Sequence, residues 1–139
     1  MQRVVAHEYG KVGGAAAGQM ENIKVYVRAR PPHEPGSEGD FLVIDDDDKR
    51  KLTISDPKTA KGAKHSEVSF QFDHIFWTDT VQDTVFTHMV QPQVEHTLEG
   101  YNCCCFAYGQ TGSGKTYSMF GEDADVRGLI PRSVEHLFS

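Results

Sequence analysis

The sequence predicts an α/β domain, and three observations favour this fold class. Apolar and polar residues alternate along several short stretches, which is typical of strands. The spacing of apolar residues becomes helical after Thr80, and a glycine-rich turn then separates another apolar run from a second helical stretch. A strand–helix–strand unit that leads into such a turn is typical of α/β proteins with a central sheet.

Size and composition indicate one domain that lies outside membranes. The chain has 139 residues and a mass of 15.5 kDa, which is the size of a single domain. Its mean hydropathy is −0.48, and no stretch approaches the roughly 18 apolar residues of a membrane helix. The N-terminus carries Arg3 but no apolar run, so we expect no secretory signal. The net charge of −6 argues against nucleic acid as a partner.

The first elements are a leader and a strand. Residues 1–21 are rich in Gly and Ala without periodicity, so we expect a flexible leader with no chemistry. In the next stretch Ile23, Val25 and Val27 alternate with polar or aromatic residues, which predicts a strand that Pro31 and Pro32 end.

A hairpin and another strand follow. Residues 41–45 and 51–55 are expected to form the two strands of a hairpin around an acidic turn. The first run ends in Asp45 and so imitates the Walker B strand of nucleotide-binding proteins, but it precedes the glycine-rich turn, which favours the hairpin. Residues 67–76 alternate clearly and predict one strand with Val68, Phe70 and Phe72 on one face.

Two helical stretches are expected on either side of the glycine-rich turn. The first is capped by Asp79 or Thr80, is kinked or broken at Pro92, and ends at Gly100. Its expected packing face consists of Val81, Val85, Met89, Val94 and Leu98. A later helix in LIPRSVEHLF has Ile130, Val134 and Leu137 or Phe138 on one side. His74, His88 and His96 are too scattered for a metal site.

Three contiguous cysteines, Cys103 to Cys105, lie in the apolar run before the turn. Neighbouring strand residues point to opposite faces, so this run cannot surround a metal ion or join distant segments by disulfides. We expect small apolar residues of a buried strand in a reducing compartment.

The turn itself, GQTGSGKT, satisfies G-x-x-x-x-G-K-[ST] from Gly109 to Thr116. Glycines allow positive φ values and bring successive N–H groups around a phosphate. Lys115 supplies a mobile charge for the β and γ phosphates, and the Thr116 hydroxyl suits Mg²⁺. The helix expected to begin there directs the positive end of its dipole at the phosphates. The strand before and the helix after the motif favour a phosphate-binding loop (P-loop) over a fortuitous glycine-rich turn.

Several separated stretches, in matching order, resemble the kinesin motor domain. FAYGQTGSGKTYSM resembles the P-loop that kinesins use, and VYVRARP resembles the first strand of that family with its Arg-x-Arg-Pro ending. FQFDHIF followed by a helix and LEGYN, and later GLIPRSVEHLF, resemble the family on either side of the loop. Cys103 and Cys104 depart from the small-residue and Thr pattern common after LEGYN, but both are compact.

The resemblance implies the N-terminal part of the kinesin P-loop fold, with only part of the central sheet and its helices. It implies ATP and Mg²⁺ as cofactors, with Thr116 as the Mg²⁺ ligand. The implied nucleotide-binding residues are Arg28, Arg30, Pro31, Gly109, Gln110, Thr111, Gly112, Ser113, Gly114, Lys115, Thr116 and Tyr117. A proline face and an aromatic ring form a stacking slot for adenine, on which a guanidinium can also lie. Without the resemblance, a solvated strand end is the plainer interpretation of Arg28 and Arg30.

The resemblance also implies an ATP-hydrolysing microtubule motor in the cytoplasm, with microtubule contacts mostly outside these residues. The sequence contains neither the Asn-x-x-Ser-Ser-Arg nor the Asp-Leu-Ala-Gly-Ser-Glu switch motif, so residues 22–139 are expected to be a motor fragment without catalytic residues of its own. Two alternatives remain open: a nucleotide- or tubulin-binding module without turnover, and an unrelated P-loop enzyme such as a kinase or a nucleic-acid ATPase.

Two finer expectations concern subfamily and filament contact. FWTDT, GLIPR and HLF lean toward the vesicle-transport kinesins that carry a forkhead-associated domain. The loop with Lys58, Lys61 and Lys64 corresponds to one that touches the microtubule in some kinesins, although a plain solvated loop is the stronger reading.

Overall fold

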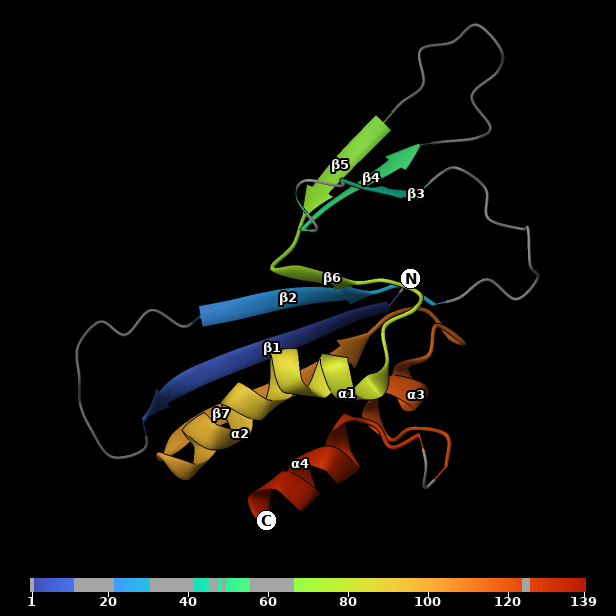
Figure 1. Ribbon diagram of the computed structural model, residues 1–139. Helices are drawn as coiled ribbons and strands as arrows, with labels where there is room; N and C mark the ends of the chain where they lie inside the picture. Colours follow the sequence, from blue (N-terminus) through green and yellow to red (C-terminus); the bar gives the residue numbers. More distant parts are fainter. Residues whose placement is uncertain are drawn as a thin grey trace, which may run out of the picture.

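A computed structural model describes residues 2–11, 22–30, 42–45, 48, 50–55, 67–123 and 126–139. These residues form two sheets and a set of helices (Figure 1). The larger sheet has four strands in the order β6-β2-β1-β7, and the smaller has three in the order β3-β4-β5. The strands are β1 (Gln2–Lys11), β2 (Asn22–Arg28), β3 (Leu42–Ile44), β4 (Lys51–Ser55), β5 (Glu67–Gln71), β6 (His74–Phe76) and β7 (Tyr101–Tyr108).

The helices lie on one side of the larger sheet, and the small sheet lies beyond its β6 edge (Figure 1). They are α1 (Gln82–Val85), the π-helical turn η1 (Phe86–Val90), α2 (Gln91–Leu98), α3 (Lys115–Met119) and α4 (Leu129–Leu137). The mixture of helices and sheets, with a glycine-rich loop between β7 and α3, confirms the predicted α/β class.

Successive residues of β2 serve two separate cores. Tyr26 packs with Phe76 and with residues of α1, η1, α2 and α4. Val27 points the other way and packs with Leu52 and Ile75, so it joins the small sheet to the large one. This follows from the period of two along a strand, which sends neighbouring side chains to opposite faces.

Strand β1 corrects the expectation of a flexible leader for residues 2–11. It pairs antiparallel with β2 on one side and with β7 on the other, so it is an interior strand of the sheet. The sequence signal is weak because β1 lacks a clean apolar alternation, and pairing on both edges supplies the backbone hydrogen bonds instead. Residues 12–21, the rest of the expected leader, lie outside the described part of the chain.

The hairpin prediction is confirmed, but the single strand expected over residues 67–76 is wrong. β3 pairs antiparallel with β4, while β5 joins the small sheet and β6 pairs in parallel with β2. Asp73 separates β5 from β6, and its carboxylate accepts a hydrogen bond from the Val25 backbone N–H at 2.7 Å. The Asp73 N–H in turn donates to the Val25 carbonyl, so this residue fixes the chain to β2 as it changes sheets.

The long helical stretch after Thr80 is irregular where a break was expected. Pro92 lies in the first turn of α2, directly after the π-helical turn η1. Proline cannot donate a backbone hydrogen bond, and a wider turn before it accommodates the ring. The expected cap at Asp79 or Thr80 is wrong, because Val81 is the N-cap and no side chain caps it. Val81 and Leu98 are exposed, whereas Val85, Met89 and Val94 are buried as expected.

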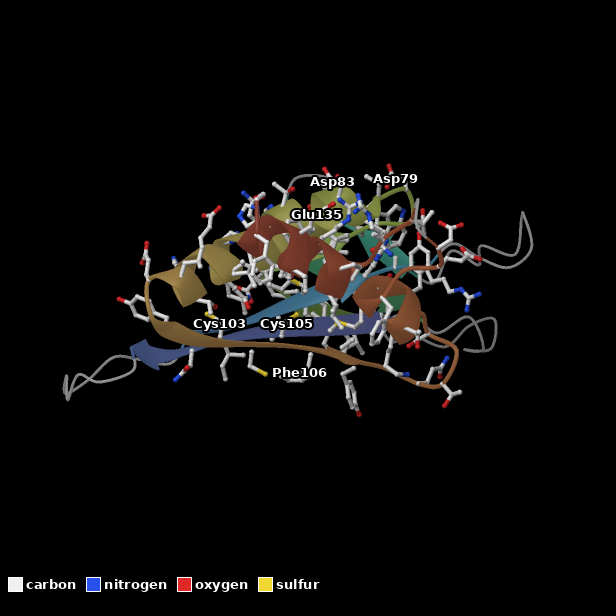
Figure 2. The ribbon with its side chains drawn as sticks, turned by 90° about the horizontal axis from the view of Figure 1, so that it is seen from below. Asp79, Asp83, Cys103, Cys105, Phe106 and Glu135 are labelled. Carbon is white, nitrogen blue, oxygen red and sulfur yellow. The ribbon has the colours of Figure 1, made fainter. Side chains whose placement is uncertain are left out.

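Strand β7 has one packed and one open face, which corrects the expectation of a buried strand. Cys105 packs against the helix core, whereas Cys104, Phe106 and Tyr108 are exposed. Figure 2 shows Cys103 and Cys105 on the helix side of the strand and Phe106 on the other side. Within the described part of the chain no element covers the open face, and β7 is hydrogen-bonded along one edge only.

Helix α4 is confirmed, and the apolar side that its spacing predicts is exposed in the structure. Leu129 is only 2% exposed, whereas Ile130, Val134 and Phe138 remain exposed. Helix α4 contacts the rest of the helical layer mainly through its first turn and its polar side. Among the described helices, none combines the length and the apolar character needed to cross a membrane.

Candidate functional site

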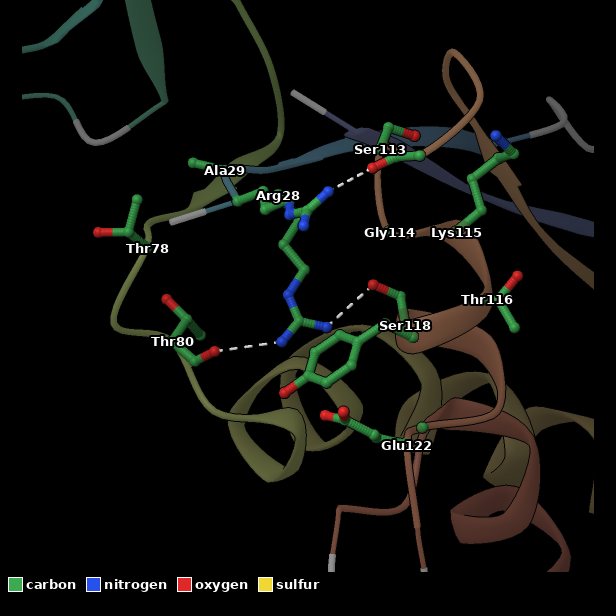
Figure 3. Close-up of a pocket in the computed structure, with 14 residues that line it drawn as sticks. Arg28, Ala29, Thr78, Thr80, Ser113, Gly114, Lys115, Thr116, Ser118 and Glu122 are labelled. Atoms are coloured by element: carbon green, nitrogen blue, oxygen red, sulfur yellow. Dashed lines mark hydrogen bonds between the residues drawn. The ribbon is translucent and has the colours of Figure 1, made fainter. Parts of the chain in front are cut away.

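A cleft of about 720 Å³ opens where β2 ends beside the glycine-rich loop (Figure 3). Its walls come from the end of β2, the segment before α1, and the loop with helix α3. The residues that line it are Arg28, Ala29, Arg30, Thr78, Thr80, Gly112, Ser113, Gly114, Lys115, Thr116, Tyr117, Ser118, Gly121 and Glu122.

The loop has the backbone geometry that the motif predicts. Gly112 and Gly114 adopt positive φ values of 79° and 95°, and Gly114 is the residue from which α3 begins. A Cβ atom in such a conformation is strained, which explains glycine at both positions. Arg30 donates a hydrogen bond of 2.5 Å to the Gly112 carbonyl and thereby attaches the loop to the end of β2.

Three side chains of the loop differ in how their polar groups are satisfied. The Lys115 ammonium donates to the Gly109 and Gln110 carbonyls, each at 2.8 Å. The Ser113 side chain is buried, and its hydroxyl has no hydrogen-bond partner among the described residues. Thr116 is exposed at the cleft. A buried hydroxyl without a partner, close in sequence to an ammonium at the same cleft, fits a site that receives an anion such as phosphate.

The opposite wall is built around Arg28, which is 7% exposed and therefore not a solvated strand end. Its guanidinium donates to the Ser118 hydroxyl at 2.9 Å and to the Thr80 carbonyl at 3.2 Å, as Figure 3 shows. A third bond of 2.7 Å joins it to the Gln82 side-chain carbonyl. The Tyr117 ring lies against it, with 5.1 Å between the guanidinium carbon and the ring centre.

Burial lowers the pKa of the Arg28 guanidinium, and the neighbouring Tyr117 hydroxyl partly offsets this effect. Arginine still remains charged at every physiological pH. The lining residues therefore carry three positive charges, on Arg28 and Arg30 at the end of β2 and on Lys115 at the start of α3. The edges of the Arg28 guanidinium are already hydrogen-bonded. The flat surface of this wall that a ligand can reach is therefore the Tyr117 ring.

The structure brings most of the predicted site residues together. Those that line the cleft are Arg28, Arg30, Gly112, Ser113, Gly114, Lys115, Thr116 and Tyr117. Gly109, Gln110 and Thr111 belong to the same loop but are not among the lining residues. Pro31, Lys58, Lys61 and Lys64 lie outside the described residues.

Sequence reasoning missed Thr80, Gln82 and Ser118, which hold Arg28. A signal existed for one of them: Gln82 shares a helix face with Val85 and Met89, so it is a polar residue at a position expected to be buried. Ser118 and the Thr80 carbonyl carry no such signal, because their role depends on tertiary contacts.

The structure agrees with the prediction that Asp45 belongs to the hairpin and is not a Walker B residue. The Asp45 carboxylate lies 3.6 Å from the Lys51 ammonium within the hairpin, and Asp45 does not line the cleft. The described residues contain no group of three or more His, Cys, Asp or Glu side chains that could hold a metal ion.

A glycine-rich loop between a strand and a helix, with Lys115 and Thr116 at the start of that helix, defines a P-loop protein. The family described as the kinesin motor domain matches residues 28–139. The chain belongs to the kinesin motor domain family.

Several kinesins are similar to this chain. Kinesin-like protein KIF15 from Homo sapiens is 40% identical over 129 residues, which cover 84% of this chain and 9% of the relative. Kinesin-like protein KIF1A from Rattus norvegicus is 37% identical over 127 residues and covers 85% of this chain and 7% of the relative. Among solved structures, the motor domain of the Kar3-like kinesin from Ashbya gossypii matches with a TM-score of 0.63 and 33% identity.

That structural match covers 81% of this chain and 35% of the solved chain. The chain thus spans about a tenth of the length of the kinesin relatives named above and about a third of the solved motor domain. It corresponds to part of the kinesin motor fold, as the sequence predicts.

Proposed function

We propose that these residues are the ATP-binding portion of a microtubule motor that couples ATP hydrolysis to movement. The observation that carries the proposal is the single cleft in which a P-loop faces a wall made by Arg28 and Tyr117. Kinesin motors bind nucleotide, and the buried unpartnered hydroxyl of Ser113 supports a phosphate in this cleft.

The residues present fit ATP and Mg²⁺. The loop N–H groups, Ser113 and Lys115 would hold the phosphates, and the Thr116 hydroxyl would be the protein ligand of Mg²⁺. Tyr117 offers its exposed ring, 39% accessible, as a stacking surface for adenine beside Arg28, and the resemblance assigns Arg30 and Pro31 to the same base site. When bound, Mg²⁺ would neutralise the phosphate charge.

Hydrolysis needs more than these residues supply. Phosphoryl transfer depends on positioning and charge stabilisation around the γ-phosphate and the attacking water. Both switch motifs that serve this purpose in kinesins are absent from the sequence. We therefore propose that residues 1–139 bind nucleotide but do not turn it over by themselves.

The decisive experiment uses the longest natural chain that contains these residues. Purified protein is assayed for ATP turnover with and without microtubules. We expect turnover that rises when microtubules are added. ATP binding and microtubule co-sedimentation without turnover would favour the non-hydrolysing module. Stimulation by nucleic acid in place of microtubules would favour an unrelated P-loop ATPase, which the family match does not support.

Domain limits, subfamily and location are further parts of the proposal. We place the motor domain at residues 22–139, with β1 as an added strand. FWTDT, GLIPR and HLF support a vesicle-transport kinesin with a forkhead-associated domain, and a downstream sequence without that domain would exclude this subfamily. The proposed partners are ATP, ADP and microtubules, with neither nucleic acid nor membrane insertion. The proposed location is the microtubule cytoskeleton of the cytoplasm.

A further inference from the structure

Gln82 is a buried polar residue of α1, and the other buried residue of this helix, Val85, belongs to the core. Its side chain is 4% exposed. Burying an amide costs free energy unless both its carbonyl and its NH₂ group find partners. The partners of Gln82 therefore show what its presence accomplishes.

Both ends of the Gln82 amide are bonded, and each end contacts a different element. Its carbonyl oxygen accepts from the Arg28 guanidinium at 2.7 Å, at the end of β2. Its NH₂ group donates to the Tyr117 carbonyl at 2.6 Å, in α3. A glutamine amide can accept from a guanidinium through its carbonyl oxygen and donate to a carbonyl through its NH₂ group at the same time. Gln82 thus connects three elements that are distant in sequence.

The two groups that Gln82 contacts belong to the residues that form one wall of the cleft. The Tyr117 ring lies 5.1 Å from the Arg28 guanidinium carbon, so the position of one limits the position of the other. The P-loop contacts, from Lys115 to Gly109 and Gln110 and from Arg30 to Gly112, do not involve Gln82. Loss of Gln82 would therefore disturb this wall more than the phosphate loop.

We propose that Gln82 is a positioning residue that fixes Arg28 against Tyr117 and thereby sets the affinity of the cleft for the base of the nucleotide. This inference rests on the proposed function. It predicts that base-dependent affinity and phosphate affinity respond differently to a change at Gln82.

The test compares ATP with inorganic tripolyphosphate, which has the phosphates but no base. Binding of both is measured by calorimetry on the natural chain and on Gln82→Leu, which keeps the volume and removes both hydrogen bonds. We expect the ATP affinity to fall about tenfold, the effect of losing bonds to a charged group, while tripolyphosphate affinity changes less than about twofold. Equal losses for both ligands, or no loss for ATP, would overturn the inference.

Two further variants separate positioning from simple destabilisation. Gln82→Glu keeps an acceptor for Arg28, and we expect its ATP affinity to lie within about threefold of the natural chain. A loss as large as in Gln82→Leu would show that Gln82 does not act through its hydrogen bond with Arg28.

Gln93→Leu is the matched control, because Gln93 is also buried but does not line the cleft. We expect Gln93→Leu to bind both ligands as the natural chain does, and a tenfold loss of ATP affinity there would assign the effect to folding.

The natural chain itself distinguishes the two levels of the proposal. If it binds neither ATP nor tripolyphosphate, the proposed function fails and the inference fails with it. If it binds both with equal affinity, the phosphate site stands, but a base site fixed by Gln82 is refuted.

Discussion

Lys115 and Ser113 both line the cleft, but only Lys115 has hydrogen-bond partners for its side chain. The Lys115 ammonium is bonded to two loop carbonyls, whereas the Ser113 hydroxyl is buried without a partner among the described residues. A bound phosphate would replace the neutral carbonyl acceptors of the Lys115 ammonium with a charged acceptor. It would also accept a hydrogen bond from the Ser113 hydroxyl. Both changes favour binding, because hydrogen bonds that involve charged groups are stronger than neutral ones.

The first prediction concerns Lys115. We expect Lys115→Ala to weaken ATP binding by about 1.5–3 kcal/mol, or roughly 10- to 100-fold, because a charge-assisted contact is lost. Equilibrium binding of a fluorescent ATP analogue to the natural chain measures this effect. Lys24→Ala is the matched control, since Lys24 is exposed on β2 and does not line the cleft. Unchanged affinity in Lys115→Ala would remove the support for the P-loop assignment.

A second prediction concerns stability at Gly121, where the chain turns after α3. Its φ is 93°, and an added Cβ would lie 1.9 Å from the Val126 carbonyl oxygen. Gly121→Ala therefore requires the backbone to move, and we expect a loss of about 2–4 kcal/mol in the free energy of unfolding. Denaturant unfolding of the natural chain measures this loss.

Gly112→Ala provides the comparison for that experiment. Gly112 also has a positive φ, of 79°, but an added Cβ there meets no atom within 4 Å. We expect it to cost only about 1 kcal/mol, the strain of the backbone conformation alone. Equal losses in the two variants would show that the close approach to Val126 has no energetic consequence.

At the scale of elements, two adjacent residues of strand β7, Cys104 and Cys105, differ in burial and in the reactivity expected of their thiols. Burial raises the pKa of the Cys105 thiol to about 11, and the neighbouring Cys104 adds to this shift. Cys104 itself is exposed on the open face. Because the thiolate is the reactive form, we expect iodoacetamide at pH 8 to modify Cys104 at least about tenfold faster than Cys105. Peptide mass spectrometry over time measures both rates, and equal rates would contradict the packed position of Cys105.

The same shift has a consequence for stability at alkaline pH. The folded-state pKa of Cys105 is raised above the ordinary value of 9.0, so the folded state retains its proton longer than the unfolded state. The stabilisation from the buried neutral thiol is therefore complete below pH 9 and is lost as the pH rises through about 11. Cys105→Ser would be expected to reduce this loss, because serine does not ionise in that range.

The sequence predicted most elements but not where each one faces. Alternation predicted β2 and the hairpin, and the glycine motif placed the loop, because these signals are local. Strand β1 and the split at Asp73 were missed, since they depend on pairing with strands distant in sequence. The apolar face predicted for α4 exists in the sequence, yet Val134 and Phe138 remain exposed. Periodicity identifies an apolar face but does not supply what covers it.

One wall of the candidate site, the P-loop, could be predicted from the sequence because its signal is local. The opposite wall, formed by Arg28 and Tyr117, could not. The P-loop from Gly109 to Thr116 is a contiguous motif, so its chemistry is readable from the sequence. Arg28 and Tyr117 entered only through resemblance to a family. Their support by Gln82 and Ser118 joins residues 54 and 90 positions apart from Arg28, and no local pattern predicts such contacts.

At the scale of the whole molecule, the uncovered surfaces determine how the isolated chain would behave. Phe106 and Tyr108 are 48% and 66% exposed on β7, whose outer edge is unpaired in the described structure. Exposed apolar side chains next to an open strand edge favour association between copies. Phe120 and Phe138, at the ends of α3 and α4, are also exposed, at 62% and 87%.

We therefore expect residues 1–139 alone to aggregate or to lack cooperative unfolding. Light scattering and calorimetry on the purified chain test this, with the chain extended through its downstream reading frame as the control. A sharp two-state transition of monomeric 1–139 would contradict the expectation. An extended chain that aggregates equally would show that the open face of β7 is not the cause.

Strand β2 imposes a constraint that neither its length nor its composition reveals. Three consecutive residues have different environments. Tyr26 packs in the core with the helices, Val27 packs in the core with the small sheet, and Arg28 forms the cleft wall with Tyr117. Inserting or deleting one residue would exchange the two faces of the strand, placing an aromatic ring or a charge where a valine belongs. Both cores and the site would be disturbed together, so we expect β2 to tolerate substitutions more readily than insertions or deletions.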